Sequence, residues 1–221
     1  MMSSVFAKIK AEKLAQKLGA KAEDQASHEI DNPVLTALLN DFRADLQKQH
    51  SLESKSAKAE FKASRLDHYR DWVNGILANE AMPYDKITTE MAVWSIDAGD
   101  LDYAIQIADY MLSGDHPMPP VFEEKTASAL LRLFNQQADI ATFEQLKSIE
   151  KIFIAQDVKD DLRAKLYRKI GEHLVESDPK EALHYWDNAL ELDKEVGVKT
   201  KADQLRKKVE EPVIEEQSED G

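Results

Sequence analysis

The sequence predicts an all-α protein in which a helical hairpin region is followed by a tetratricopeptide-like helical bundle. Glycine and proline are scarce, at seven residues each in 221, as is typical of helical chains. Apolar residues recur at helical spacing through most of the chain, and residues 85–112 show two such patterns that meet at Gly99 and Asp100. Glycine can end the first helix in a left-handed conformation, and aspartate can cap the second. These residues therefore predict a helical hairpin.

A second hairpin on the same plan is predicted near the C-terminus. The order of residue types in residues 178–190 partly repeats that in residues 100–112. The spacing of Ala182, Trp186 and Ala189 also resembles the second helix of a tetratricopeptide repeat. Any antiparallel pair of helices explains this pattern equally well, so both interpretations stay open.

Composition excludes several classes of protein. The absence of cysteine excludes disulfides and thiolate metal sites. No segment has the length and hydropathy of a membrane span, and lysines interrupt the N-terminal segment too often for a secretory signal. No histidine pair has the spacing of helical metal ligands, and no phosphate-binding glycine loop occurs. We therefore expect a cytoplasmic protein with no metal, no cofactor and no membrane partner.

The charge is distributed unevenly along the chain. The net charge is −13, which by itself argues against a partner made of phosphate. The first 70 residues, however, hold twelve lysines or arginines and ten acidic residues, whereas the remainder is strongly acidic. A nucleic acid is therefore expected to bind the N-terminal third.

Residues 1–31 are predicted to form a mobile basic N-terminal arm. A short amphipathic helix fits residues 5–18, and four basic residues surround its apolar strip: Lys8, Lys10, Lys13 and Lys17. These lysines either contact DNA or only keep a mobile arm in solution. The pattern favours neither alternative.

Residues 32–80 are predicted to form a helical hairpin for oligomerisation and DNA binding. Asn32 and Pro33 have the order of a cap followed by a first-turn proline. The second helix is poor in large apolar residues over its first half, so it is either exposed or completed by a neighbouring subunit. The apolar stripe of the first helix, where we expect the contact between subunits, consists of Leu35, Leu38, Leu39, Phe42 and Leu46.

Four cations recur along the second helix of this hairpin at spacings of three, four and three residues. They are Lys55, Lys58, Lys62 and Arg65. This spacing places all four on one face of the helix, where we expect them to be solvated and unpaired. Such a face suits a phosphate backbone, although spacing alone fits a plain solvated face somewhat better.

The remaining segments are a helical bundle over residues 81–208 and a disordered acidic tail over residues 209–221. Within the bundle, helices are expected over residues 122–137, 143–153 and 158–175. The tail holds six acidic residues and no basic one. Its composition predicts disorder, and its charge suits a basic surface of a protein partner.

Three segments carry a family resemblance: WVNGIL at residues 72–77, AVWSIDAGDLDYAIQIADYML at residues 92–112, and residues 158–199. Over residues 34–210 the chain resembles the small terminase subunit of peduovirus-type temperate tailed phages, often labelled the terminase endonuclease subunit. The resemblance implies binding to packaging-site double-stranded viral DNA, a ring-like homo-oligomer, and recruitment of the large ATPase subunit during phage assembly in the bacterial cytoplasm. Two alternatives are a tetratricopeptide-like adaptor that binds only protein and the DNA-cutting subunit of terminase.

A metal-dependent nuclease needs several convergent carboxylates, usually with a lysine that supports the attacking water. The candidates are Glu123 with Lys125, and the cluster of Asp97, Asp100 and Asp102. Structural roles explain these residues better, since aspartate is favoured at caps and turns and glutamate in a first helical turn. No catalytic residue is therefore assigned, and whether the chain is an enzyme stays open.

Overall fold

The computed structural model describes residues 33–210, and this part of the chain is all-α, as predicted, with no β-strand. The helix expected over residues 5–18, the cap expected at Asn32 and residues 211–221 of the expected tail lie outside the described residues. None of the helices over residues 33–210 has the length and hydropathy that crossing a membrane requires.

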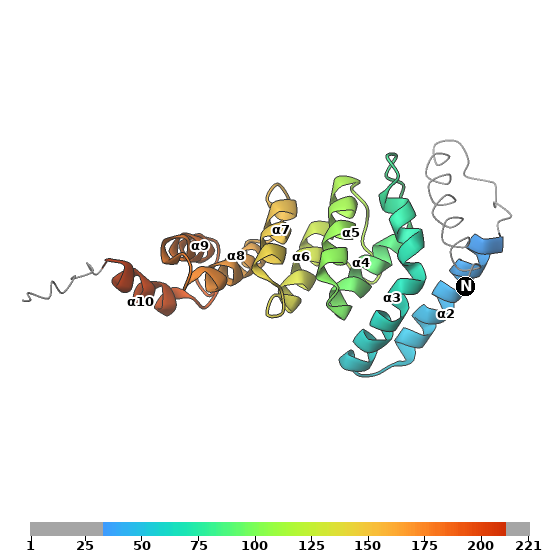
Figure 1. Cartoon of the computed structure of the whole chain (residues 1–221), viewed down its shortest axis with the longest axis horizontal. Helices are drawn as coiled ribbons and strands as arrows, with labels where there is room; N and C mark the ends of the chain where they lie inside the picture. Colours follow the sequence, from blue (N-terminus) through green and yellow to red (C-terminus); the bar gives the residue numbers. More distant parts are fainter. Residues whose placement is uncertain (1–32, 211–221) are drawn as a thin grey trace, which may run out of the picture.

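The helices follow one another along the long axis of the molecule, with α2 at one end and α10 at the other (Figure 1). Their bounds are α2 (Pro33–Ser51), α3 (Lys55–Leu77), α4 (Lys86–Ala98), α5 (Leu101–Ser113), α6 (Thr126–Gln137), α7 (Phe143–Phe153), α8 (Asp160–Leu174), α9 (Pro179–Leu192) and α10 (Lys199–Glu210). Helix α4 packs on α6 and α6 on α8, while α5 packs on α7. Consecutive helix pairs are thus stacked in series, and their tetratricopeptide-like geometry stays a prediction.

Short-range signals in the sequence place the helix ends. Gly99 ends α4 with a left-handed φ of 79°, and the Asp100 side chain accepts a hydrogen bond from the Tyr103 backbone N–H at the start of α5. Thr142 and Gln145 form the predicted capping box of α7. The predicted central hairpin is therefore confirmed, because its turn depends only on neighbouring residues.

Two predicted boundaries are wrong. The helix expected from residue 122 begins at Thr126, and Phe122 lies in the preceding loop, where the Arg132 guanidinium is 5.9 Å from its ring centroid. Helix α10 continues to Glu210, so residues 209 and 210 belong to a helix and not to the tail. Helical periodicity does not identify an apolar ring that packs from a loop, or acidic residues that end a helix.

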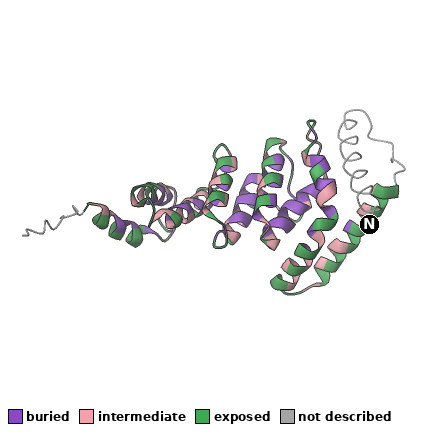
Figure 2. Ribbon diagram, in the orientation of Figure 1, coloured by how far each residue is buried: buried purple, intermediate pink, exposed green. Residues whose placement is uncertain are grey.

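One hydrophobic core extends from α2 to α9 and crosses the boundary predicted at residue 80 (Figure 2). Tyr69 and Trp72 of α3 and Met91 and Trp94 of α4 are each at most 4% exposed. Their rings and side chains belong to a single cluster. Residues 32–80 therefore do not have a core separate from that of the following helices.

A second, smaller cluster joins α8, α9 and α10 at the C-terminal end. Gly171 of α8 allows the Trp186 indole of α9 to approach closely, because a Cβ atom at residue 171 would lie 2.5 Å from the ring. Trp186 Nε1 donates a hydrogen bond to the Arg168 carbonyl oxygen at 3.1 Å. This contact holds α9 against α8 and positions the last helix beside both.

Candidate nucleic-acid interface

Helix α3 begins with two cations that form no ion pair with any residue in 33–210. Ser54 caps the helix by accepting a hydrogen bond from the Ala57 backbone N–H at 3.1 Å, which places Lys55 and Lys58 in its first turn. Lys55 is exposed and Lys58 half-exposed. Neither forms an ion pair with a residue of the described chain. Both ammonium groups are thus available to a phosphate.

Lys62 differs, and the expectation that it is solvated and unpaired was wrong. Only 5% of Lys62 is exposed, and its Nζ donates to Asp97 Oδ2 of α4. Glu90 lies in the same region, where it accepts a hydrogen bond from Trp94 Nε1 at 3.1 Å, and burial raises the pKa of its carboxyl group. Lys62 is buried because α4 packs on the same face of α3 that carries the cations.

The same expectation was wrong for Arg65. Its Nε donates to Asp45 Oδ2 of α2 at 2.6 Å, and the Tyr69 hydroxyl donates to the same oxygen at 2.6 Å. Burial and the neighbouring Asp45 raise the pKa of Tyr69, so its hydroxyl stays protonated as a donor. Arg65 therefore ties α3 to α2, and its guanidinium is already engaged with a carboxylate.

The apolar stripe of α2 is partly used within the chain itself. Phe42 is 2% exposed and meets the Tyr69 ring edge-on, with 5.9 Å between the ring centroids. Phe42 is therefore a core residue in this structure and is not accessible to a neighbouring subunit. The other four residues pack against the core but stay half-exposed: Leu35, Leu38, Leu39 and Leu46. Their role in oligomerisation stays a prediction.

The aspartates considered for a nuclease are bound to structural partners. Asp97 pairs with Lys62, as described above. Asp100 caps α5 and also accepts from Arg70 Nη2 at 2.8 Å. Asp102 accepts a hydrogen bond from Gln145 Nε2 at 3.0 Å. Over residues 33–210, no three histidine, aspartate or glutamate side chains are placed to share a metal ion.

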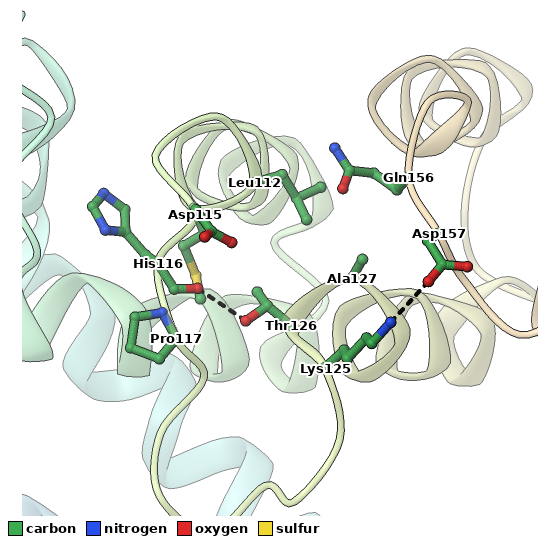
Figure 3. A pocket seen from close by; sticks show the side chains of 10 residues that line it. Leu112, Asp115, His116, Pro117, Lys125, Thr126, Ala127, Gln156 and Asp157 are labelled. Carbon is green, nitrogen blue, oxygen red and sulfur yellow. Dashed lines mark hydrogen bonds and ion pairs between the residues drawn. The ribbon is translucent and has the colours of Figure 1, made fainter.

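Glu123 and Lys125 do not converge on a reaction centre either. Lys125 Nζ pairs with Asp157 Oδ2 at 2.8 Å, at the edge of a cavity of about 390 Å³ (Figure 3). Thr126 donates from its hydroxyl to the His116 carbonyl oxygen at 2.9 Å and so fixes the proline-rich loop beside this cavity. Asp115 and Asp157 line the cavity from different loops. The Lys125–Asp157 pair joins the start of α6 to the loop before α8.

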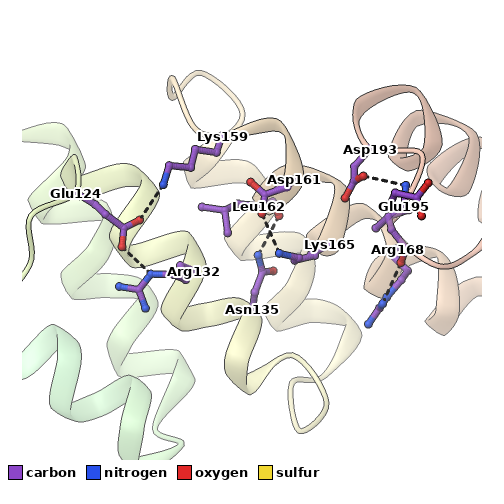
Figure 4. Close-up of polar contacts among 11 residues, drawn as sticks. Glu124, Arg132, Asn135, Lys159, Asp161, Leu162, Lys165, Arg168, Asp193 and Glu195 are labelled. Carbon is purple, nitrogen blue, oxygen red and sulfur yellow. Dashed lines mark hydrogen bonds and ion pairs between the residues drawn. The ribbon is translucent and has the colours of Figure 1, made fainter.

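Polar contacts also hold α6 against α8 (Figure 4). Glu124 accepts from Arg132 Nε at 2.7 Å and lies 3.7 Å from Lys159 Nζ. Asn135 Nδ2 donates to the Leu162 carbonyl oxygen at 2.9 Å. Each group joins two neighbouring helices or loops, which is the expected use of polar side chains at a helix junction.

Comparisons with known proteins decide the family. The family model for the phage small terminase subunit matches residues 35–164. A protein of Escherichia phage P2 named "Terminase, endonuclease subunit" is 30% identical over 185 residues, which cover 80% of this chain and 74% of that protein. The chain belongs to the phage small terminase subunit family. Its membership supports a role in phage genome packaging.

No solved structure matches this chain. The family match covers α3 and the central hairpin and ends within α8, before α9 and α10. The C-terminal helix also carries a feature that the sequence reasoning missed. Helix α10 holds five basic and two acidic residues, although it lies in the part of the chain that is acidic as a whole. Counting charge over short windows, instead of over the whole remainder, would have revealed it.

Proposed function

We propose that this chain binds packaging-site double-stranded viral DNA, assembles into a homo-oligomer and recruits the large ATPase subunit of terminase in the host cytoplasm. The observation that carries this proposal is the family match over residues 35–164. Packaging requires that the viral DNA be distinguished from other DNA. The sequence has no nucleotide-binding loop, so the chain is suited to recognising DNA and not to driving its translocation. The large subunit then supplies the ATPase activity.

In this proposal the DNA contacts come from Lys55 and Lys58 together with the arm lysines, Lys8, Lys10, Lys13 and Lys17. The first two support it because they are accessible and have no carboxylate partner in the described chain. Lys62 and Arg65 have a different role: they hold α3 against α4 and α2. They thereby orient the first turn of α3 without touching phosphate themselves.

The contact between subunits in this proposal uses the half-exposed leucines of α2. Leu38 and Leu39 keep part of their apolar surface in water in the single chain, and covering that surface is favourable by about 25 cal/mol per Å². A second copy of this chain is the simplest partner, since most oligomers are built from identical chains. A ring forms where these leucines meet a different surface of the next copy, because a contact between two identical surfaces closes as a dimer.

A gel-shift measurement tests the proposal. Purified full-length protein is titrated into a duplex that carries the phage packaging site and into a random duplex of equal length. The packaging-site duplex should shift at a lower protein concentration. A tetratricopeptide-like adaptor would shift neither duplex, and equal shifts would contradict recognition of a site.

The same samples address the DNA-cutting alternative, which rests on the printed name of the phage P2 relative. Supercoiled DNA with the packaging site is incubated with the protein and Mg²⁺, with and without the large subunit. Because Asp97, Asp100 and Asp102 are engaged in an ion pair, a helix cap and a hydrogen bond respectively, we expect no nicking by this chain alone. Co-purification of the large subunit with the tagged full-length chain tests recruitment.

A further inference from the structure

A groove of about 660 Å³ lies between α8, α9 and α10 at the C-terminal end. Its apolar floor consists of Val175, Trp186 and Leu205. Lys201 and Lys208 of α10 line it from one side, and Lys169, Glu172 and Glu176 complete its charged lining. The groove thus combines an apolar surface with ammonium groups, which suits a short peptide that carries both apolar and acidic residues.

The cations of the groove differ in how far they are neutralised within the chain. Lys201 Nζ lies 3.2 Å from Glu172 Oε1. Lys169 pairs with Asp139 and Glu172. Lys208 forms no ion pair within residues 33–210 and is exposed. Among the lysines of the groove, the least neutralised charge is therefore that of Lys208, in the last turn of α10.

The chain that follows α10 has the matching composition. Residues 211–221 read EPVIEEQSEDG, with adjacent Val213 and Ile214 between acidic residues and no basic residue. Pro212 disfavours helical continuation through the preceding residue, so the chain can reverse at this point. The six residues 211–216 span up to about 20 Å when extended, and the part of α10 from Lys201 to Glu210 rises only about 14 Å. The segment can therefore reach the whole length of the groove.

We propose that residues 212–216 bind the groove between α8, α9 and α10 of the same chain, with Val213 and Ile214 on its apolar floor and Glu215 and Glu216 beside Lys201 and Lys208. The basic surface suited to the acidic tail is then part of this chain itself. A tethered segment has a high effective concentration at such a site, which favours the internal contact over a free peptide. Any partner segment of similar chemistry must displace residues 212–216 before it binds here. The proposal does not depend on DNA binding.

Photo-cross-linking of the full-length chain tests this contact. A variant with the photoreactive amino acid p-benzoylphenylalanine in place of Ile214 is irradiated and its cross-linked peptides are mapped by mass spectrometry. A mixture of ¹⁵N-labelled and unlabelled chains separates cross-links within one chain from those between chains. We expect cross-links within one chain to residues 169–176, 186 or 201–208. Cross-links to another surface, only between chains, or absent altogether would overturn the proposal.

A pair of charge reversals on α10 tests the specificity of the contact. Lys208→Glu changes a residue that lines the groove, whereas Lys207→Glu makes the same charge change on an exposed neighbour outside the lining. Lys208→Glu should lower the cross-link yield about two- to fivefold, as expected for loss of one partly exposed ion pair. Adding the single compensating reversal Glu215→Lys to Lys208→Glu should restore part of it. Equal losses for Lys207→Glu and Lys208→Glu would contradict a contact in the groove.

Discussion

Lys62 of α3 and Asp97 of α4, thirty-five residues apart, form an ion pair in which the lysine is only 5% exposed. Lys58, one turn earlier on α3, has no such partner among the described residues. Two cations of the same regularly spaced set therefore have different roles. Lys62 holds α3 and α4 together, whereas Lys58 is available to a ligand.

Lys62→Gln should lower the free energy of unfolding by about 1–3 kcal/mol, because Asp97 then loses its partner at a largely buried contact. The expected loss of stability is smaller than for a fully buried ion pair, because the Asp97 side chain is 31% exposed. Lys58→Gln, the matched control, should change stability by less than about 0.5 kcal/mol. Urea denaturation monitored by circular dichroism measures both. Equal effects of the two variants would argue that the pair does not stabilise the fold.

Replacing Lys55 and Lys58 with glutamine should weaken the salt dependence of DNA binding. Each phosphate contact contributes about −0.9 to the slope of log affinity against log salt, so the loss is up to about 1.8 per engaged subunit. Lys180→Gln with Lys194→Gln is a control of equal charge at exposed positions far along the chain. Fluorescence anisotropy from about 50 to 200 mM salt measures the slopes. An unchanged slope in the first variant would shift the DNA contacts to the N-terminal arm.

Leu38→Asp with Leu39→Asp should reduce the mass of the assembly measured by light scattering, because two charges would enter the apolar contact between subunits. Ala37→Asp with Ala44→Asp adds the same charge to exposed positions of the same helix and should leave the mass unchanged. Circular dichroism must show that both variants stay helical. A wild-type protein that is a monomer at all concentrations would refute the predicted interface.

Gly171→Ala should destabilise the C-terminal helices although alanine is the better helix former by about 1 kcal/mol. The added Cβ atom would lie 2.5 Å from the Trp186 ring and 3.1 Å from the Ala182 carbonyl oxygen, and such overpacking typically costs about 1–3 kcal/mol. Thermal unfolding monitored by Trp fluorescence measures the change. In the Trp186→Leu background, Gly171→Ala should lower the stability by less, since the ring is absent. An equal loss of stability in both backgrounds would exclude the clash as its cause.

The stability of the fold should fall as the pH decreases below about 6.5, the pKa of an unperturbed histidine. His116 is 6% exposed, and its ring stacks on the Tyr110 ring. Its buried Nε2 forms no hydrogen bond with a described residue. Burial lowers the pKa of His116, and a backbone hydrogen bond to Met82 raises that pKa by less. The unfolded chain therefore binds the proton more readily, and stability falls until the pH is below the folded pKa as well. His116→Phe should flatten urea-denaturation stability between about pH 7 and 5; an unchanged profile would exclude His116.

The sequence alone determined the helical class, the central hairpin and the caps at Asp100 and Thr142. These features depend on hydrophobic spacing and on hydrogen bonds between residues three apart, so the local chain contains the complete signal. Helix starts that lack a side-chain cap, such as that of α6 at Lys125, offer no such signal and were placed less well.

Only the tertiary structure decided which cations of α3 are available and which residue of the α2 stripe is buried. Lys62 meets its partner across thirty-five residues and Arg65 across twenty, and Phe42 is covered by Tyr69 of the next helix. Helical periodicity shows which residues share a face, but not which neighbouring helix covers that face. The packing of α3 between α2 and α4 makes that choice, and it leaves Lys55 and Lys58 without an ion-pair partner among residues 33–210.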